Sequence, residues 1–358
     1  MAQPRASTAV DAWAVAGAVL AFAGVESLVG ADWRTAAHAG LAFVFAFALH
    51  ERGWRALAWA ALGAGALALA HGFSDATVGG AMAGGLLQAL ATLGLAAGLL
   101  FAASWSAAKV RTPSSISEAL SAGAIILALL GVFLLLRWIA AGGAGAPLDR
   151  FTDSALRGCA LMAGAHMALA RPRQKLGRIG AWRGHVLLAL GVLQIALSNG
   201  LMLNPWWGLS PAAIGGPALF NALALGFAAP AALLFFAARR LYAHQREPAR
   251  AYAGAGALMA LVWAALEIRR AFHGAEMAAP FVLNTEGAAY GLLLLSAGVL
   301  NAAFAQRWRG RVGADLRAIS DGVAGGAMAL GGLLLLLSLI GGWDRGAGTG
   351  FALVLALL

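Results

Sequence analysis

The sequence predicts an all-α fold: a polytopic transmembrane helix bundle of about 11–12 helices with a cytoplasmic amino terminus. Three observations predict it. Hydrophobic residues make up 61% of the 358 residues and charged residues only 11%, whereas a soluble domain carries about 25% charged residues. The apolar residues lie in long runs, and basic residues gather in every second loop between the runs. The excess apolar surface must face lipid, so the lipid bilayer is the expected partner.

Each expected helix is an apolar run of about 20 residues, the length that crosses a bilayer. In chain order the runs predict helices over 12–30, 35–50, 53–72, 77–104, 118–141, 152–170, 180–203, 215–238, 250–270, 285–306 and 316–341. A twelfth helix begins near 347, and the chain stops inside it at Leu358. We expect that helix to be incomplete, tilted or re-entrant, with a fragment of a longer protein as one explanation. No hydrophilic stretch is long enough for a soluble domain, so 1–358 is expected to form a single transmembrane helical domain.

The basic residues predict which side of the membrane each loop faces. Eighteen of the 25 Lys and Arg residues lie at the amino terminus or in the loops on the same side as it. The positive-inside rule places this side in the cytoplasm, which predicts a multi-pass protein of the bacterial inner (cytoplasmic) membrane. Orientation in the membrane also explains the net charge of +10, so nucleic acid is not an expected partner.

Small residues and one proline predict local features of the helices. Gly80 and Gly84 form a small-xxx-small pair, as do Gly322 and Gly326, and such pairs suit close helix contacts. Pro230 is expected to kink the helix over which it lies, because proline cannot donate a backbone hydrogen bond.

Charged residues at membrane depth are costly and often functional. The sharpest group ends the helix over 250–270 and begins the next one; it consists of Glu267, Arg269, Arg270, His273 and Glu286. In the functional interpretation these residues line an outward-facing pocket, where the arginines bind an anionic solute or lipid headgroup and a glutamate carries a proton. In the structural interpretation they form a boundary salt-bridge cluster that joins the two helix ends.

Three further charged residues are candidates for substrate binding or proton transfer: Arg137, Arg157 and Asp321. Arg157 lies four residues after Asp153, a spacing that predicts an ion pair within one helix. Arg137 could meet Asp153, or Arg137 and Arg157 could add positive potential to an anion site. Asp321 is a lone acid inside the helix over 316–341, where it either couples to protons or pairs with Arg317.

The sequence predicts no metal site and no cofactor. His38 and His71 lie near the outer ends of adjacent helices, and two facing histidines could ligate haem or a metal. No fixed spacing supports that interpretation. Cys159 is the single cysteine, so the chain can form neither an intramolecular disulfide nor a cysteine metal cluster.

One region resembles a known family. Residues 220–300 contain Phe220-Asn221, Pro230, Arg239-Arg240, the run LEIRRAFHG at 266–274, and Thr285-Glu286 followed by Tyr290. On these residues the chain resembles a bacterial family of predicted membrane proteins, domain of unknown function 2339. Its members are usually longer, often with a soluble amino-terminal stretch, and the family carries no agreed activity. The resemblance therefore implies positions of interest, Glu267, Arg269, Arg270 and Glu286, without a reaction.

Three functions remain open. The first is a transporter, or a transporter-like membrane subunit, for an envelope-related anionic or amphiphilic solute. The second is an envelope-modifying transferase with an outward-facing active site, because the cluster around Glu267 has residue types suited to acid–base chemistry. The third is a non-catalytic membrane scaffold whose outer charges bind a protein partner that the sequence does not identify. The sequence contains no P-loop, HExxH or Gly-x-Ser-x-Gly motif, which argues against ATP-driven transport by this chain alone.

Overall fold

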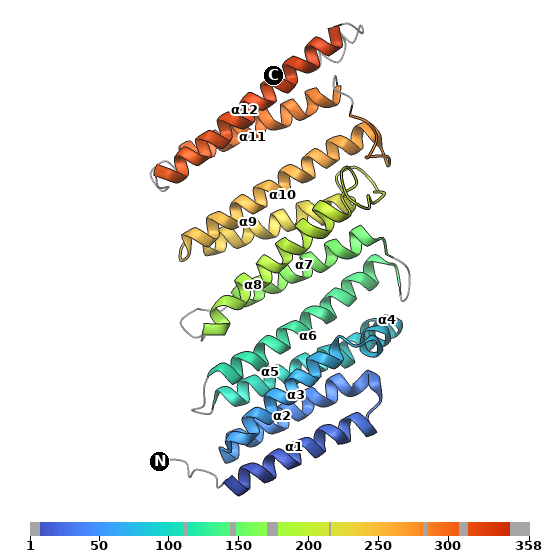
Figure 1. Cartoon of the computed structure of the whole chain (residues 1–358), viewed down its shortest axis with the longest axis vertical. Coiled ribbons are helices and arrows are strands. Elements are labelled where there is room, and N and C mark those ends of the chain that lie inside the picture. The colour runs from blue at the N-terminus through green and yellow to red at the C-terminus, as the bar shows by residue number, and fades with distance from the viewer. Residues whose placement is uncertain are drawn as a thin grey trace. The chain divides into compact units, whose positions relative to one another are not determined.

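The computed structural model describes residues 8–109, 114–143, 148–169, 178–214, 216–281, 285–307 and 314–343. All regular elements in these ranges are helices, and long helices joined by a loop run in opposite directions within a unit (Figure 1). The predicted all-α fold is therefore confirmed. The residue contacts divide the chain into two compact units, Met1–Gln194 and Ile195–Leu358. The expectation of a single domain stays a prediction.

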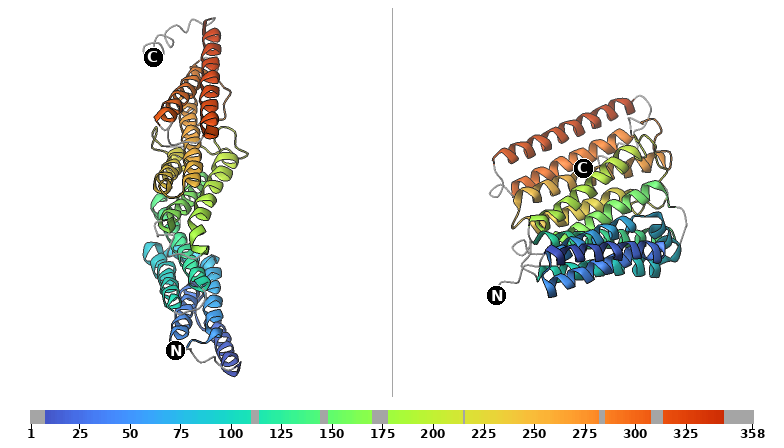
Figure 2. Two further views of the ribbon diagram at one scale, coloured as in Figure 1. Left: turned by 90° about the vertical axis from the view of Figure 1, so that its left-hand side faces the viewer. Right: turned by 60° about the horizontal axis from the view of Figure 1, so that its bottom comes forward.

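The first unit consists of antiparallel helices joined by short loops, which Figure 2 shows side by side. Its elements are α1 (Thr8–Leu28), η1 (Ala31–Trp33), α2 (Arg34–Arg52), α3 (Arg55–Gly72), α4 (Asp75–Ala89), η2 (Leu90–Gly94), α5 (Leu95–Ala108), α6 (Ser114–Ala140), α7 (Arg150–Leu169) and α8 (Arg178–Gln194). These bounds confirm the helices expected in this part of the chain, with ends that differ by a few residues.

The second unit continues the same alternation. Its elements are η4 (Ile195–Met202), η5 (Ala224–Ala228), α9 (Ala229–Leu241), α10 (Arg246–His273), α11 (Thr285–Arg307) and α12 (Ala314–Trp343). The helix expected to begin near 347 lies outside the described residues.

One predicted boundary in the second unit is wrong. The helix expected over 215–238 begins only near Ala224. Before it, Gly216 and Leu219 have φ angles of 96° and 64°, which a right-handed helix does not allow. Pro217 contributes to the interruption, because the residue before a proline avoids the helical conformation.

Eight of the helices in the described ranges are long and apolar enough to cross a membrane. They are Thr8–Leu28, Asp75–Ala108, Ser115–Ala140, Trp182–Met202, Ala224–Leu241, Arg246–His273, Thr285–Ala303 and Ser320–Leu339. The sequence predicted eleven such spans, and α2, α3 and α7 account for the difference. These three helices bury seven, nine and ten residues against their neighbours, whereas α1 buries one. A helix in the interior of a bundle exposes less surface to lipid, so it can carry fewer large apolar residues.

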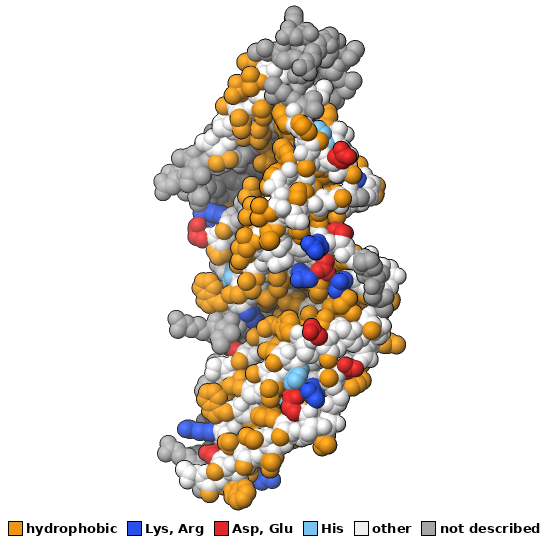
Figure 3. Space-filling model, turned by 45° about the vertical axis from the view of Figure 1, so that its right-hand side comes forward, with side chains coloured by type: hydrophobic (Ala, Val, Ile, Leu, Met, Phe, Trp, Pro, Cys, Tyr) orange, Lys and Arg blue, Asp and Glu red, His pale blue; other side chains and the backbone are white. Residues whose placement is uncertain are grey.

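The interior of the first unit is rich in alanine, and many of its large apolar side chains face outward. Ala42, Ala61 and Ala64 are fully buried between α2 and α3, while Trp13 is 79% exposed. Hydrophobic side chains are spread over the face shown in Figure 3, where charged side chains form only small groups. A surface of this kind is suited to lipid contact, with small residues that let the helices pack closely.

The predicted glycine pairs differ in their contacts: a Cβ atom at Gly80 would lie 3.5 Å from the Asp32 carboxylate of η1. A Cβ atom at Gly322 or Gly326 would have nothing within 4 Å among the described residues, so the predicted contact there is wrong. The close approach is instead between α11 and α12, where a Cβ at Gly291 would lie 2.8 Å from the Gly331 carbonyl oxygen. In a glycine-rich chain the local pattern cannot indicate which helix face turns inward.

Several membrane helices contain irregular turns. The π-helical turns η2, η4 and η5 lie within or beside long apolar helices. η5 comes immediately before Pro230, whose ring nitrogen cannot donate to the helix, and a π turn accommodates such a missing bond. The kink predicted at Pro230 itself stays a prediction.

Candidate functional site

The charged cluster predicted in the second unit is centred on an ion pair between α10 and α11. Arg269 Nη1 lies 2.7 Å from Glu286 Oε1, and both side chains are 0% exposed. His273, four residues after Arg269, places its Nε2 atom 2.9 Å from Glu286 Oε2. The three residues that the sequence placed near one boundary thus meet in a buried network.

The loop after α10 and a tryptophan complete the environment of Arg269. The guanidinium donates to the carbonyl oxygen of Met277 at 2.7 Å and to that of Ala279. Its Cζ atom lies 5.0 Å from the Trp206 ring centroid, and Trp206 stacks on Tyr290 of α11. A buried cation with this many partners has little capacity left for a solute, so the geometry favours the structural interpretation of the pair.

Glu267 and Arg270 point to a different part of the second unit. Glu267 Oε1 accepts a hydrogen bond of 2.6 Å from Asn221 Nδ2, and Arg270 donates to the carbonyl oxygens of Gly216 and Pro217. Both side chains therefore hold the non-helical segment before η5 against the end of α10. The five residues predicted as one site separate into a buried network and a more exposed clamp.

In the first unit, two arginines share one aspartate. Arg137 Nε of α6 lies 3.0 Å from Asp153 Oδ1, and Arg157 Nη2 lies 2.5 Å from Asp153 Oδ2. Both predicted pairings of Asp153 are confirmed. Arg157 remains 56% exposed and Arg137 27% exposed, so this group, the arginine–aspartate triad, keeps one excess positive charge in contact with its surroundings.

A break in the membrane helix of α4 lies next to the triad. Gly85 has φ 67° and ψ −153°, a non-helical conformation inside α4, and Figure 1 shows α4 turned away from the direction of α5. A Cβ at Gly85 would lie 3.4 Å from the Trp138 indole nitrogen, and Met82 accepts a 3.0 Å contact from Arg137. Two neighbouring residues of α6, Arg137 and Trp138, therefore connect the break with the triad.

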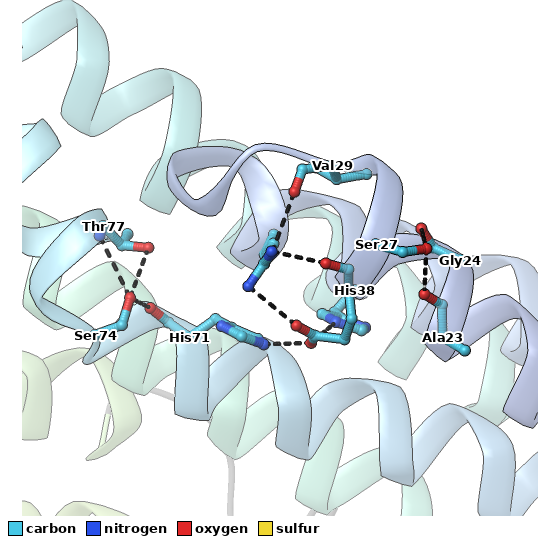
Figure 4. Close-up of polar contacts among 10 residues, drawn as sticks. Ala23, Gly24, Ser27, Val29, His38, His71, Ser74 and Thr77 are labelled. Atoms are coloured by element: carbon cyan, nitrogen blue, oxygen red, sulfur yellow. Dashed lines mark hydrogen bonds and ion pairs between the residues drawn. The ribbon is translucent and has the colours of Figure 1, made fainter.

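A third polar group joins α1, α2 and α3. Glu26 Oε1 lies 2.9 Å from His38 Nε2 and 2.5 Å from His71 Nε2, and Figure 4 shows both histidines pointing at one carboxylate. Arg34 holds the other oxygen of Glu26 at 3.2 Å. The two imidazole rings stack with centroids 5.3 Å apart and an interplanar angle of 4°.

The family comparison agrees with the resemblance seen in the sequence and extends it. The family described as predicted membrane protein (DUF2339) matches residues 1–353. The chain belongs to this family. No curated protein and no solved structure matches the chain. The match shows that this DUF2339 protein is a membrane protein, and it includes the first unit, which the resemblance over 220–300 did not reach.

Two remaining sequence expectations have different outcomes in this DUF2339 protein. Asp321 is exposed on α12, and the Arg317 side chain that could pair with it lies outside the described residues. The histidines His38 and His71 were recognised as neighbours, but Glu26 was not grouped with them. The topology could have indicated this group. Glu26 near the end of α1, His38 near the start of α2 and His71 at the end of α3 are expected on the same side of the membrane.

Proposed function

We propose that this DUF2339 protein is a transporter for an anionic or amphiphilic solute of the bacterial envelope, located in the inner membrane with a cytoplasmic amino terminus. The observation that carries the proposal is the helix break at Gly85 beside the arginine–aspartate triad. The residues that support it differ from the Glu267 cluster that the sequence emphasised.

The break supports transport because lipid does not satisfy exposed backbone groups. Non-helical backbone at membrane depth is tolerated where it is buried in protein or lines a cavity, and transporters use such broken helices at their solute sites. Gly85 is buried, and the helical segment after it begins with the positive end of its dipole at the break. A negative group would be stabilised there.

The charges of the triad favour an anion. Two guanidinium groups share the single carboxylate of Asp153, so one positive charge is left uncompensated. Arg157 is the more exposed arginine and can bind a second oxyanion bidentately while Asp153 stays paired with Arg137. Leu87 and Ile139 are exposed close to the break, which provides an apolar surface for the tail of an amphiphilic solute.

Flux through reconstituted protein tests the proposal. Proteoliposomes would be tested for uptake of radiolabelled glycerol phosphate and, separately, for translocation of fluorescent phosphatidylglycerol, which distinguishes a soluble anion from a lipid headgroup. We expect flux in one assay, lost in Arg157→Gln and Gly85→Ala and kept in Arg250→Gln, whose arginine lies in an exposed ion pair of the second unit. No flux of either probe, or equal flux in all variants, would contradict the proposal.

The orientation in the membrane has its own test. In a chain with Cys159→Ala, a cysteine at Ser210 is expected to react with a membrane-impermeant maleimide added to intact cells. A cysteine at Ala243, in the loop between α9 and α10, is expected to react only after the cells are opened. The reverse pattern would place the amino terminus outside.

The transferase hypothesis has less support from the geometry. Its acid–base residues were Glu267, Arg270, His273 and Glu286. Glu286 is fully buried and paired with Arg269, while Glu267 is bonded to an amide. General acid–base chemistry needs a group within reach of a substrate. The carboxylates of Glu267 and Glu286 are instead bonded to other side chains of the protein.

A further inference from the structure

We propose that Glu26, His38 and His71 form a binding site for a divalent first-row transition-metal ion of the Zn²⁺ type. The sequence predicted no metal, and the transport proposal uses other residues, so this inference stands independently of it. Glu26 lies in the last turns of α1, His38 in the first turns of α2, and His71 at the end of α3. The site therefore forms where three helix ends of one unit meet.

The potential ligand atoms already converge. One ligand atom from each of the three residues lies within 4.8 Å of the other two. The two stacked rings both direct their Nε2 atoms to the same oxygen, Glu26 Oε1. His38 is fully buried, and its Nδ1 atom has no hydrogen-bond partner in the described part of the chain, so this side chain acts through Nε2.

Small movements would make room for an ion. Zinc binds nitrogen and carboxylate oxygen at about 2.0–2.2 Å in tetrahedral geometry, so ligand atoms are about 3.3–3.5 Å apart. The present separations of 2.9 and 2.5 Å would have to increase by less than about 1 Å. The Glu26 side chain is 39% exposed, and it can move by this amount without displacing the buried His38 ring.

The surroundings provide outer contacts for the carboxylate ligand. Arg34 holds Glu26 Oε2 at 3.2 Å, and the carbonyl oxygens of Val29 and Glu26 accept from the same guanidinium at 3.1 and 2.7 Å. Hydrogen bonds to a ligating carboxylate fix its orientation. The positive charge of Arg34 opposes the charge of a cation, so we expect moderate affinity and an exchangeable ion.

The helix ends that supply the ligands are fixed to each other. Thr35 of α2 and Thr77 of α4 share a 3.1 Å hydrogen bond. Ser74 donates to the His71 carbonyl oxygen at 2.7 Å and caps α4 by accepting from the Thr77 amide (Figure 4). A site held by such contacts needs little reorganisation to bind, and its exposed Glu26 edge leaves a path for the ion to enter.

The ligand set indicates the class of metal. Two imidazoles and one carboxylate suit zinc and the non-haem iron group, whereas calcium and magnesium prefer sites made of oxygen ligands alone. Three protein ligands leave at least one coordination position for water or a solute. The site is thus of the open type, in which the ion remains accessible to a further ligand.

Metal binding to the purified full chain, with any purification tag removed, tests the inference. Equilibrium dialysis against Co²⁺, followed by displacement with Zn²⁺, gives the stoichiometry, and visible absorption of Co²⁺ reports the geometry. The variants are Glu26→Gln and His71→Asn, since both side chains are partly exposed. The control is His244→Asn, an exposed histidine of the second unit. We expect the wild type and the control to bind one more ion per chain than the two site variants, or to bind at least about tenfold more tightly.

A second measurement needs no variant. Zn²⁺ is expected to protect His71 of the wild-type chain from diethyl pyrocarbonate, as detected by mass spectrometry, while His244 stays reactive. Equal metal binding by the wild type and both site variants would overturn the inference. So would the absence of Co²⁺ and Zn²⁺ binding by the wild type, or equal modification of His71 with and without Zn²⁺; the three residues would then form only a hydrogen-bonded network.

Discussion

The substitution Glu286→Gln tests whether the buried pair between α10 and α11 holds the second unit together. Glutamine has nearly the volume of glutamate, so the packing of α11 is kept and only the negative charge is removed. Arg269 then remains as a fully buried cation. Its remaining partners are two carbonyl oxygens, the His273 ring nitrogen, a neutral amide and the Trp206 ring.

The expected magnitude follows from this environment. Removing one partner of a buried ion pair costs about 3–5 kcal/mol, because the other charge is left uncompensated. The two carbonyl contacts and the ring contact persist in the variant and offset part of the loss. We therefore expect Glu286→Gln to lower the free energy of unfolding by about 3 kcal/mol, near the lower end of that range.

The assay is reversible unfolding of the purified chain in mixed micelles with an increasing fraction of SDS, followed by circular dichroism. The matched control is Glu247→Gln, which removes the same charge from an exposed pair with Arg250 and should cost about 0–1 kcal/mol. In the double variant Arg269→Met/Glu286→Gln, the unpaired buried charge is gone, and part of the stability should return. A cost for Glu286→Gln no larger than that of Glu247→Gln would refute the reasoning.

Three further predictions concern packing, capping and hydrogen bonding between helices. Gly331→Ala places a Cβ 2.7 Å from a carbonyl oxygen of α11 and should lower the free energy of unfolding by about 1–3 kcal/mol; Gly326→Ala, at an open position, should be neutral, and equal effects would contradict the packing. Asn221→Ala removes the side chain that accepts from the Leu223 and Ala224 amides in the first turn of the following helix. We expect a loss of about 0.5–2 kcal/mol and faster hydrogen exchange at these amides, and unchanged exchange would count against the cap. Ser104→Ala removes the hydroxyl that donates to the Ser117 carbonyl oxygen between α5 and α6 and keeps the bond from Ser117 to the backbone of residue 104. The expected loss is about 0.6 kcal/mol in the same SDS unfolding assay; a loss above about 2 kcal/mol would show that more than this bond is disturbed.

Most helices could be predicted because membrane insertion makes a simple demand on sequence. Lipid requires runs of apolar residues of a fixed length, and these runs are visible without any knowledge of contacts. The prediction was wrong at residues 216–221, where Gly216, Pro217 and Leu219 prevent a helix. The burial of α2, α3 and α7 was not predicted, because burial within the bundle cannot be read from a single segment.

The polar residues were less predictable than the helices. The pairings of Asp153 with Arg137 and Arg157 were expected, since one is local and the other joins adjacent helix ends. The division of Arg269 from its neighbour Arg270 was not expected. Adjacent residues on a helix point about 100° apart, and only the positions of α11 and of the segment before η5 decide which arginine is buried.

The sequence by itself determined that this protein is helical and lies in a membrane, because composition and apolar run length act on each segment separately. The tertiary structure decided which polar side chains meet. Glu26, His38 and His71 come from three helices, and no spacing in the sequence relates them. Gly85 is one of 48 glycines, and only its backbone angles and its contact with Trp138 distinguish it. Such sites depend on how helix ends are juxtaposed, and packing between segments decides that juxtaposition.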